Sequence, residues 1–173
     1  MKLSSVTTML TFVGGAVSQA AAFNITAISA ANNTARLECW QLASPPISGR
    51  GAVNFDLGDF DKAFVGIIPP NTTTGTINNA AQVQYSLIIA GLVHISTPHS
   101  GLPANLNDVW ITGGRQGMLI AADLKEIAAQ GHVTTFPGSE RTIIAQFPIA
   151  GNKPPAHRIL HAGPCTWKDL AEL

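Results

Sequence analysis

The sequence has little charge, since 12% of its 173 residues are Asp, Glu, Lys or Arg. Ten basic and ten acidic side chains balance, and without Lys2 nine basic residues face ten acidic ones, a formal charge of −1. No basic stripe runs along the chain, so the charge pattern predicts no nucleic-acid partner. Apolar residues make up 46% of the chain. That much apolar surface is buried either in a well-packed β-protein or around a ligand cavity.

Long apolar runs are missing beyond the start of the chain. The start combines a basic Met1-Lys2, a mostly apolar stretch over Val6–Val17 and small residues at Ser18-Gln19-Ala20, which is typical of a secretory signal peptide. We expect residues 1–21 to be removed and residues 22–173 to form one domain. No later stretch is long enough to span a bilayer. We therefore expect no membrane association after cleavage, and a secreted protein or one in the lumen of the secretory pathway.

Cysteine occurs only twice, at Cys39 and Cys165. In a secreted chain an even pair predicts a disulfide, which here would join the two ends of the domain; two reactive thiols are the alternative. Three N-glycosylation sequons begin at Asn24, Asn32 and Asn71. They agree with passage through the secretory pathway, although sequons also occur by chance.

Short β-type runs dominate the chain, separated by Gly, Pro, Asn and Ser clusters. We expect a helix at Asp123–Gln130, where Leu124, Ile127 and Ala128 have helical spacing, while Trp167–Leu173 forms a tail helix or frays. Ten short strands in one domain predict an all-β jelly roll or related barrel, which can hold one ligand in its mouth. The expected strands are Ala35–Leu42, Ala52–Leu57, Ala63–Ile68, Val83–Ala90, Leu92–Ser96, Val109–Thr112, Met118–Ala122, Val133–Phe136, Thr142–Pro148 and Arg158–His161.

A series of short motifs follows the chain. Leu37-Glu38-Cys39-Trp40-Gln41 opens the domain, Ile68-Pro69-Pro70 precedes a Gly-x-x-Asn segment, and Gly113-Gly114-Arg115-Gln116-Gly117 comes later. Gly131-His132-Val133-Thr134 and a closing Gly163-Pro164-Cys165 complete the series. In order and spacing these motifs resemble the small secreted, cupin-like proteins of filamentous fungi, over nearly all of the mature chain. The resemblance implies a single-domain jelly-roll, cupin-like barrel with one short helix and one disulfide, and is compatible with a homodimer.

The histidines that a metal-dependent cupin would need are missing. Such cupins carry His-x-His and a later Glu in a first motif and one more His in a second. Here the first-motif positions hold Ile77, Asn79 and Gln84, while the second holds His132. An isoleucine cannot bind a metal, and amides are poor ligands for iron, manganese or zinc. One imidazole alone is not enough, because a transition-metal site normally needs three or more N, O or S donors. We therefore expect neither metal nor cofactor; a metal cupin with an atypical site is an alternative.

Within this group the chain resembles the cofactor-free hetero-Diels–Alderases of fungal tropolone–sesquiterpenoid (meroterpenoid) biosynthesis. The resemblance implies an enzyme that joins a tropolone o-quinone methide to a humulene-type alkene, with a small hydrophobic organic molecule as its substrate. The alternative is a secreted cupin-like protein that binds a small molecule without catalysis.

His132 is the first catalytic candidate, because an imidazole with a pKa near neutral can protonate a leaving hydroxyl and later accept a proton. Gln84 and Arg115 are the other two, since an amide or a guanidinium can bind a tropolone oxygen. Each has a structural alternative as a hydrogen-bonded core histidine or a solvent-exposed polar side chain. The expected substrate-binding residues are Asn79, Gln82, Trp110, Thr134 and Gln146. Which face of the strand around Gln84 points inward is open at this point.

Overall fold

Two β-sheets make up most of the structure, a computed structural model that describes residues 21–114 and 116–171. Beside the strands it has a 3₁₀ turn, η1 (Ala104–Leu106), and a short helix, α1 (Trp167–Leu170). The strands are β1 (Asn24–Ala31), β2 (Thr34–Leu42), β3 (Ile47–Gly49), β4 (Ala52–Asn54), β5 (Phe64–Ile68), β6 (Thr72–Thr73), β7 (Gln84–Ala90), β8 (Leu92–Ser96), β9 (Asp108–Thr112), β10 (Met118–Ala121), β11 (Val133–Phe136), β12 (Thr142–Pro148) and β13 (His157–Ala162).

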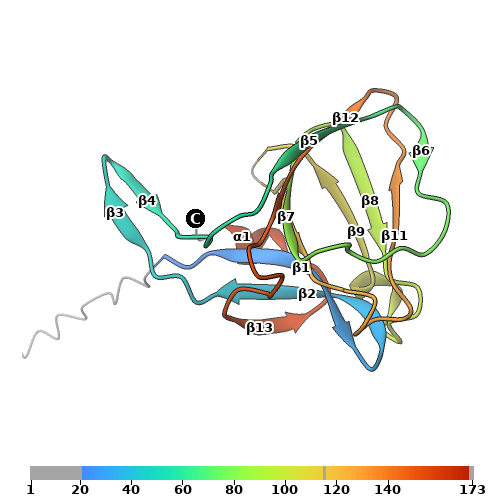
Figure 1. Cartoon of the computed structure of the whole chain (residues 1–173), viewed down its shortest axis with the longest axis horizontal. Helices are drawn as coiled ribbons and strands as arrows, with labels where there is room; N and C mark the ends of the chain where they lie inside the picture. Colours follow the sequence, from blue (N-terminus) through green and yellow to red (C-terminus); the bar gives the residue numbers. More distant parts are fainter. Residues whose placement is uncertain (1–20, 115, 172–173) are drawn as a thin grey trace, which may run out of the picture.

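The larger sheet has seven strands in the order β13-β2-β1-β10-β7-β12-β5, and the smaller has four in the order β6-β11-β8-β9 (Figure 1). Strands β1 and β10 are parallel, whereas all other neighbours within the sheets are antiparallel. The β3–β4 hairpin projects away from both sheets, and its side chains are exposed. Consecutive strands β1 and β2 are joined at Asn32 and Asn33, whose positive φ angles of 51° and 63° suit a tight hairpin.

The central strands of the seven-stranded sheet are buried on both faces, because they place apolar residues on alternate sides, whereas the edge strands β5 and β13 are exposed or half-buried. One cluster lies between the two sheets and includes Ile28, Leu37, Val93, Ile95 and Leu119. The second cluster covers the other face and is built around Ile25, Trp40, Val83, Tyr85 and Ile120. Burial on both faces settles which side of β7 points toward the space between the sheets. Val83 and Tyr85 belong to the second cluster, so Gln84 faces the space between the sheets.

The predicted disulfide between Cys39 and Cys165 is confirmed, so both cysteines are committed. It joins β2 to the segment before α1 across 126 residues of chain. In the chain-entropy model a loop of that length stabilises the fold by up to about 4–5 kcal/mol. A disulfide is typical of an oxidising compartment. Residues 1–20, which hold nearly all of the expected leader, lie outside the described part of the chain.

The all-β, single-domain class predicted from the sequence is confirmed, but the sheets do not close into a barrel. Three strands were not predicted: β1, β3 and β6. Strand β1 is rich in Ala, Ser and Thr, so its apolar pattern is weak in the sequence although most of its side chains are buried. No helix within residues 21–114 and 116–171 is long and apolar enough to cross a membrane.

The predicted helix at Asp123–Gln130 is wrong: the segment forms a turn, and the short helix is α1 in the tail. Tertiary hydrogen bonds replace the helical pattern there. The N–H of Ala129 donates to the Asn33 side chain (3.1 Å), and the N–H of Gln130 donates to the Asn33 carbonyl (3.3 Å). The turn is therefore anchored to the β1–β2 hairpin, a contact that helical spacing does not reveal.

Candidate functional site

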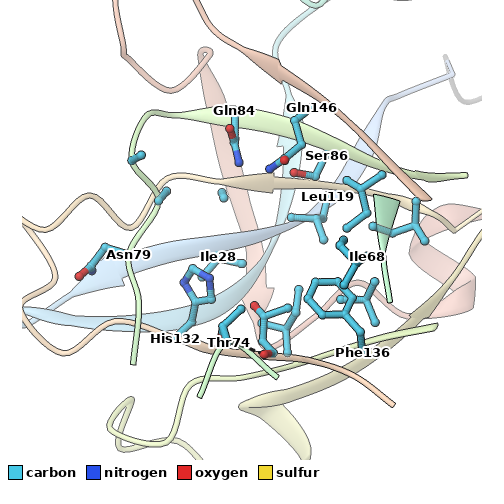
Figure 2. A pocket seen from close by; sticks show the side chains of 18 residues that line it. Ile28, Ile68, Thr74, Asn79, Gln84, Ser86, Leu119, His132, Phe136 and Gln146 are labelled. Carbon is cyan, nitrogen blue, oxygen red and sulfur yellow. Dashed lines mark hydrogen bonds between the residues drawn. The ribbon is translucent and has the colours of Figure 1, made fainter. Parts of the chain in front are cut away.

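A cavity of about 210 Å³ lies between the two sheets (Figure 2). Its apolar wall consists mainly of Ile28, Ile68, Val93, Leu119, Phe136 and Ile144. Its polar groups are neutral amides and hydroxyls together with one imidazole: Asn79, Gln84, Ser86, Gln146, Thr134, Thr74 and His132. The lining is thus mostly apolar with a few converging polar groups, which is typical of a site for a small organic ligand.

His132 is held at the cavity wall by its backbone and its ring. It precedes β11 and forms an isolated bridge with Asn78, in which each backbone N–H donates to the other residue's carbonyl at 2.8 Å. Gly131 permits this approach, since a Cβ there would lie 2.0 Å from the Asn78 carbonyl oxygen. The ring Nδ1 lies 2.7 Å from Oδ2 of Asp123. The other ring nitrogen, Nε2, has no hydrogen bond to the described residues and is the atom available to a ligand.

Asp123 is fully buried, at 0% exposure, and lies nine residues before His132. Burial raises the pKa of its carboxyl above the usual 3.8, while the hydrogen bonds from His132 and the Ala80 N–H oppose that increase. With Nδ1–H donating to Asp123, neutral His132 presents the Nε2 lone pair to the cavity. The pair therefore offers an acceptor when His132 is neutral and a donor when it is protonated, as general acid–base chemistry requires.

Asn79 supports this pair more than it faces a ligand. Its side-chain Nδ2 donates to the backbone carbonyls of Asp123 (3.0 Å) and Ala128 (2.6 Å), both within the segment Asp123–Gln130 that the sequence predicts as a helix. Asn79 also lines the cavity, but these two hydrogen bonds make it a residue that fixes the position of Asp123.

Gln84, Ser86 and Gln146 form a polar patch on the wall opposite His132 (Figure 2). Gln146 on β12 is in register with Ser86 on β7, which brings the three side chains together. None of their side chains makes a hydrogen bond to another residue in the described part of the chain, and their amide and hydroxyl groups face the cavity. Because a partly buried amide without a partner is unfavourable, these groups are suited to bind a ligand or water.

The structure brings together five of the eight predicted catalytic and substrate-binding residues: His132, Gln84, Asn79, Thr134 and Gln146. Gln82 is exposed and does not line the cavity. Trp110 is 56% exposed on the outer face of the small sheet and stacks on His94. Arg115, the remaining predicted residue, lies outside the described part of the chain.

Sequence reasoning missed Asp123, Ser86 and Thr74. Asp123 directly follows the buried run Leu119–Ala122, and an acid in that position is a usable signal, because a carboxylate beside a buried strand needs a partner. Ser86 follows from the inward face of β7 once Gln84 is placed there, since alternate residues share a face.

The donor set in the cavity does not fit a first-row transition metal. His132 is its one imidazole among the described lining residues, and its Nδ1 is already bound to Asp123. In the described part of the chain a three-residue group with metal-ligand spacing occurs at Cys39, His161 and Asp169, but the Cys39 sulfur is in the disulfide. That leaves two donors, fewer than the usual three.

Comparison with known proteins adds no relative: no family model, curated protein or solved structure matches this chain.

Proposed function

We propose that the protein binds a small, neutral, largely apolar organic molecule in the inter-sheet cavity and that His132 exchanges a hydrogen bond or a proton with an oxygen of that molecule. The observation that carries the proposal is the His132–Asp123 pair, in which a fully buried carboxylate orients an imidazole whose Nε2 is available to the cavity. Burying a carboxylate is unfavourable, and a buried carboxylate whose one side-chain partner among the described residues is a ring at a cavity wall supports a functional role for that ring.

The lining supports the neutral, apolar character of the ligand. No Lys or Arg is among the described residues that line the cavity, so an anionic ligand would find no counter-charge. The amides of Gln84 and Gln146 can donate to or accept from a ligand oxygen on the wall opposite His132. A molecule with polar groups at two ends and an apolar middle would satisfy both walls.

A catalytic role in hetero-Diels–Alder chemistry is the second candidate, and the acid–base pair favours it. His132 would protonate the hydroxyl that leaves a hydroxymethyl tropolone as water, and would accept the proton that the tropolone hydroxyl releases as the o-quinone methide forms. The methide then adds to the alkene without a further reactant, and the cavity contributes by holding the partners in reacting geometry. At about 210 Å³ the cavity is below the range of about 300–1,000 Å³ for drug-sized ligands, so joining two partners requires it to widen.

Secretion is part of the same proposal. The disulfide supports folding in an oxidising compartment, and the leader-like pattern over residues 1–21 supports export.

Binding is tested with purified protein and a set of neutral, oxygen-bearing ring compounds that includes tropolone, using thermal shift and calorimetry. We expect at least one compound to stabilise the fold and His132→Ala to weaken its binding about tenfold, the loss of one good hydrogen bond. His99→Ala is the matched control, because His99 is exposed and does not line the cavity. Equal binding by both variants would overturn the role given to His132.

Catalysis is tested by incubating the protein with a quinone-methide precursor and humulenol. A faster reaction or a single stereoisomer, lost in His132→Ala, would support the cyclase. No change from the uncatalysed reaction would eliminate catalysis and leave the binding function in place.

A further inference from the structure

Four side chains form a second, separate cluster on the outer face of the four-stranded sheet: His94, Asp108, Trp110 and Thr135. Strand alternation places them there, because their neighbours Val93, Ile95 and Ile111 are buried in the cluster between the sheets. Thr135 on β11 is in register with His94 on β8, which is in register with Trp110 on β9. The three side chains therefore form a row across the sheet, on the opposite side from the cavity.

The indole ring of Trp110 is both exposed and held in place. The side chain is 56% exposed, and its ring stacks on His94 with a centroid distance of 4.1 Å and an interplanar angle of 16°. His94 is fixed in turn, since Asp108 binds its Nε2 and the Thr135 hydroxyl lies 3.3 Å from its Nδ1. With both ring nitrogens occupied, His94 supports the indole and holds it flat. Such preorganisation reduces the entropy lost when a ligand binds the ring.

Around the indole, most residues of the four strands on this outer face are polar, with Leu92 and Val133 as the apolar exceptions, and none of them is a Lys or Arg. The Asp108 side chain is 39% exposed, and the exposed hydroxyls of Thr73 and Thr112 lie on β6 and β9. The strands β6, β8, β9 and β11 contain no Lys or Arg. A phosphate or sulfate group would meet a carboxylate there without a counter-charge. The surface instead combines a flat apolar ring with hydroxyls and a carboxylate acceptor.

We propose that this outer face is a binding site for a neutral glycan. The C–H face of a pyranose ring is flat and apolar and would stack on Trp110, whereas its equatorial hydroxyls would donate to Asp108 and exchange hydrogen bonds with the threonine hydroxyls. The site is independent of the inter-sheet cavity, which lies on the other side of the small sheet and shares none of these four residues.

The test uses the full chain with chitohexaose, cellohexaose and laminarihexaose, followed by calorimetry and tryptophan fluorescence. We expect at least one of the three saccharides to bind, and Trp110→Ala to lower its affinity about tenfold or more. Trp167→Ala is the matched control, because Trp167 is 67% exposed but has no ring stacked on it among the described residues. Asp108→Asn, which keeps the shape and removes the charge, is expected to weaken binding by a smaller factor.

Two further measurements keep the result specific. Thermal unfolding of each variant checks that the fold is intact, since an exposed side chain contributes little to the core. Tetramethylammonium is tested as a cationic probe for the same indole and carboxylate. No binding of any of the three saccharides, equal loss in Trp110→Ala and Trp167→Ala, or binding of tetramethylammonium alone would overturn the glycan site.

Discussion

His132 and Asp123 show how one proton determines what the cavity offers a ligand. In the native pair Asp123 accepts a hydrogen bond from Nδ1–H of His132, so the neutral imidazole presents its Nε2 lone pair to the cavity as an acceptor. Oδ1 of Asp123 meanwhile accepts from the Ala80 N–H at 3.4 Å, which leaves Oδ2 for the ring. An amide in place of the carboxylate would turn its N–H₂ toward Nδ1 and move the ring proton to Nε2.

Asp123→Asn is therefore predicted to separate function from stability. The raised pKa of Asp123 means that its contribution to stability is fully present below the unfolded value of 3.8 and is lost as pH rises through the folded pKa. The ionised group thus destabilises the fold at neutral pH, and asparagine removes that cost. We expect an unchanged or higher Tm at pH 7, a steeper fall in Tm toward acid pH because the stabilising protonation of Asp123 is lost, and weaker binding of ligands that donate to His132. A lower Tm at pH 7 would contradict this account.

Tyr85 gives a second test at this scale. Its hydroxyl is buried and has no hydrogen-bond partner in the described part of the chain, and burial together with the charge of Asp56 raises its pKa to about 12. Because an unpartnered hydroxyl gains nothing from burial, Tyr85→Phe is predicted to leave the free energy of unfolding unchanged or to raise it by about 1 kcal/mol. Urea unfolding measures this, and a loss of more than about 1 kcal/mol would reveal a partner such as an ordered water.

Among the elements, the segment from Gly131 to β11 depends most on a single small residue. A Cβ at Gly131 would lie 2.0 Å from the Asn78 carbonyl oxygen and 2.9 Å from Nδ2 of Asn79, which holds the Asp123 turn. Gly131→Ala is predicted to lower Tm and to weaken ligand binding together, because the segment that carries His132 before β11 must shift. Gly66→Ala in β5 is the control, since its nearest atom lies 4.0 Å away. Equal Tm values for the two variants would contradict the predicted crowding.

Strand positions follow from the sequence better than the site does. Residues 92–96, 133–136 and 142–148 were predicted at their observed bounds, because apolar alternation and flanking turn residues are local signals. The inward face of Gln84 and the turn at Asp123 depend on contacts between distant segments. Gln84 faces the cavity because a second cluster takes Val83 and Tyr85, and the turn forms because Asn33 and Asn79 bind it. The local spacing of apolar residues in the sequence therefore predicts neither the orientation of Gln84 nor the turn at Asp123.

For the molecule as a whole, the disulfide is the one covalent tie between its two ends. Cys39 lies in the second strand and Cys165 just before the final helix, at a sequence separation of 126. Reduction followed by alkylation is predicted to lower the free energy of unfolding by up to about 4–5 kcal/mol, since the unfolded chain regains the entropy of a long loop. Denaturant unfolding of the intact and the alkylated protein measures the difference. A change below about 1 kcal/mol would show that the sheets alone hold the ends together.

The parallel pairing of β1 with β10 also sets the order in which the molecule can be completed. During synthesis β1 meets β2 at once, but its other edge waits until Leu119, the partner of Thr26, has been made. Contacts so distant along the chain slow folding, and in the interval that open strand edge is a template for a strand of another nascent copy. The open edge of β1, at the centre of the large sheet, is thus the place where intermolecular pairing competes with folding. Refolding yield should therefore fall as protein concentration rises.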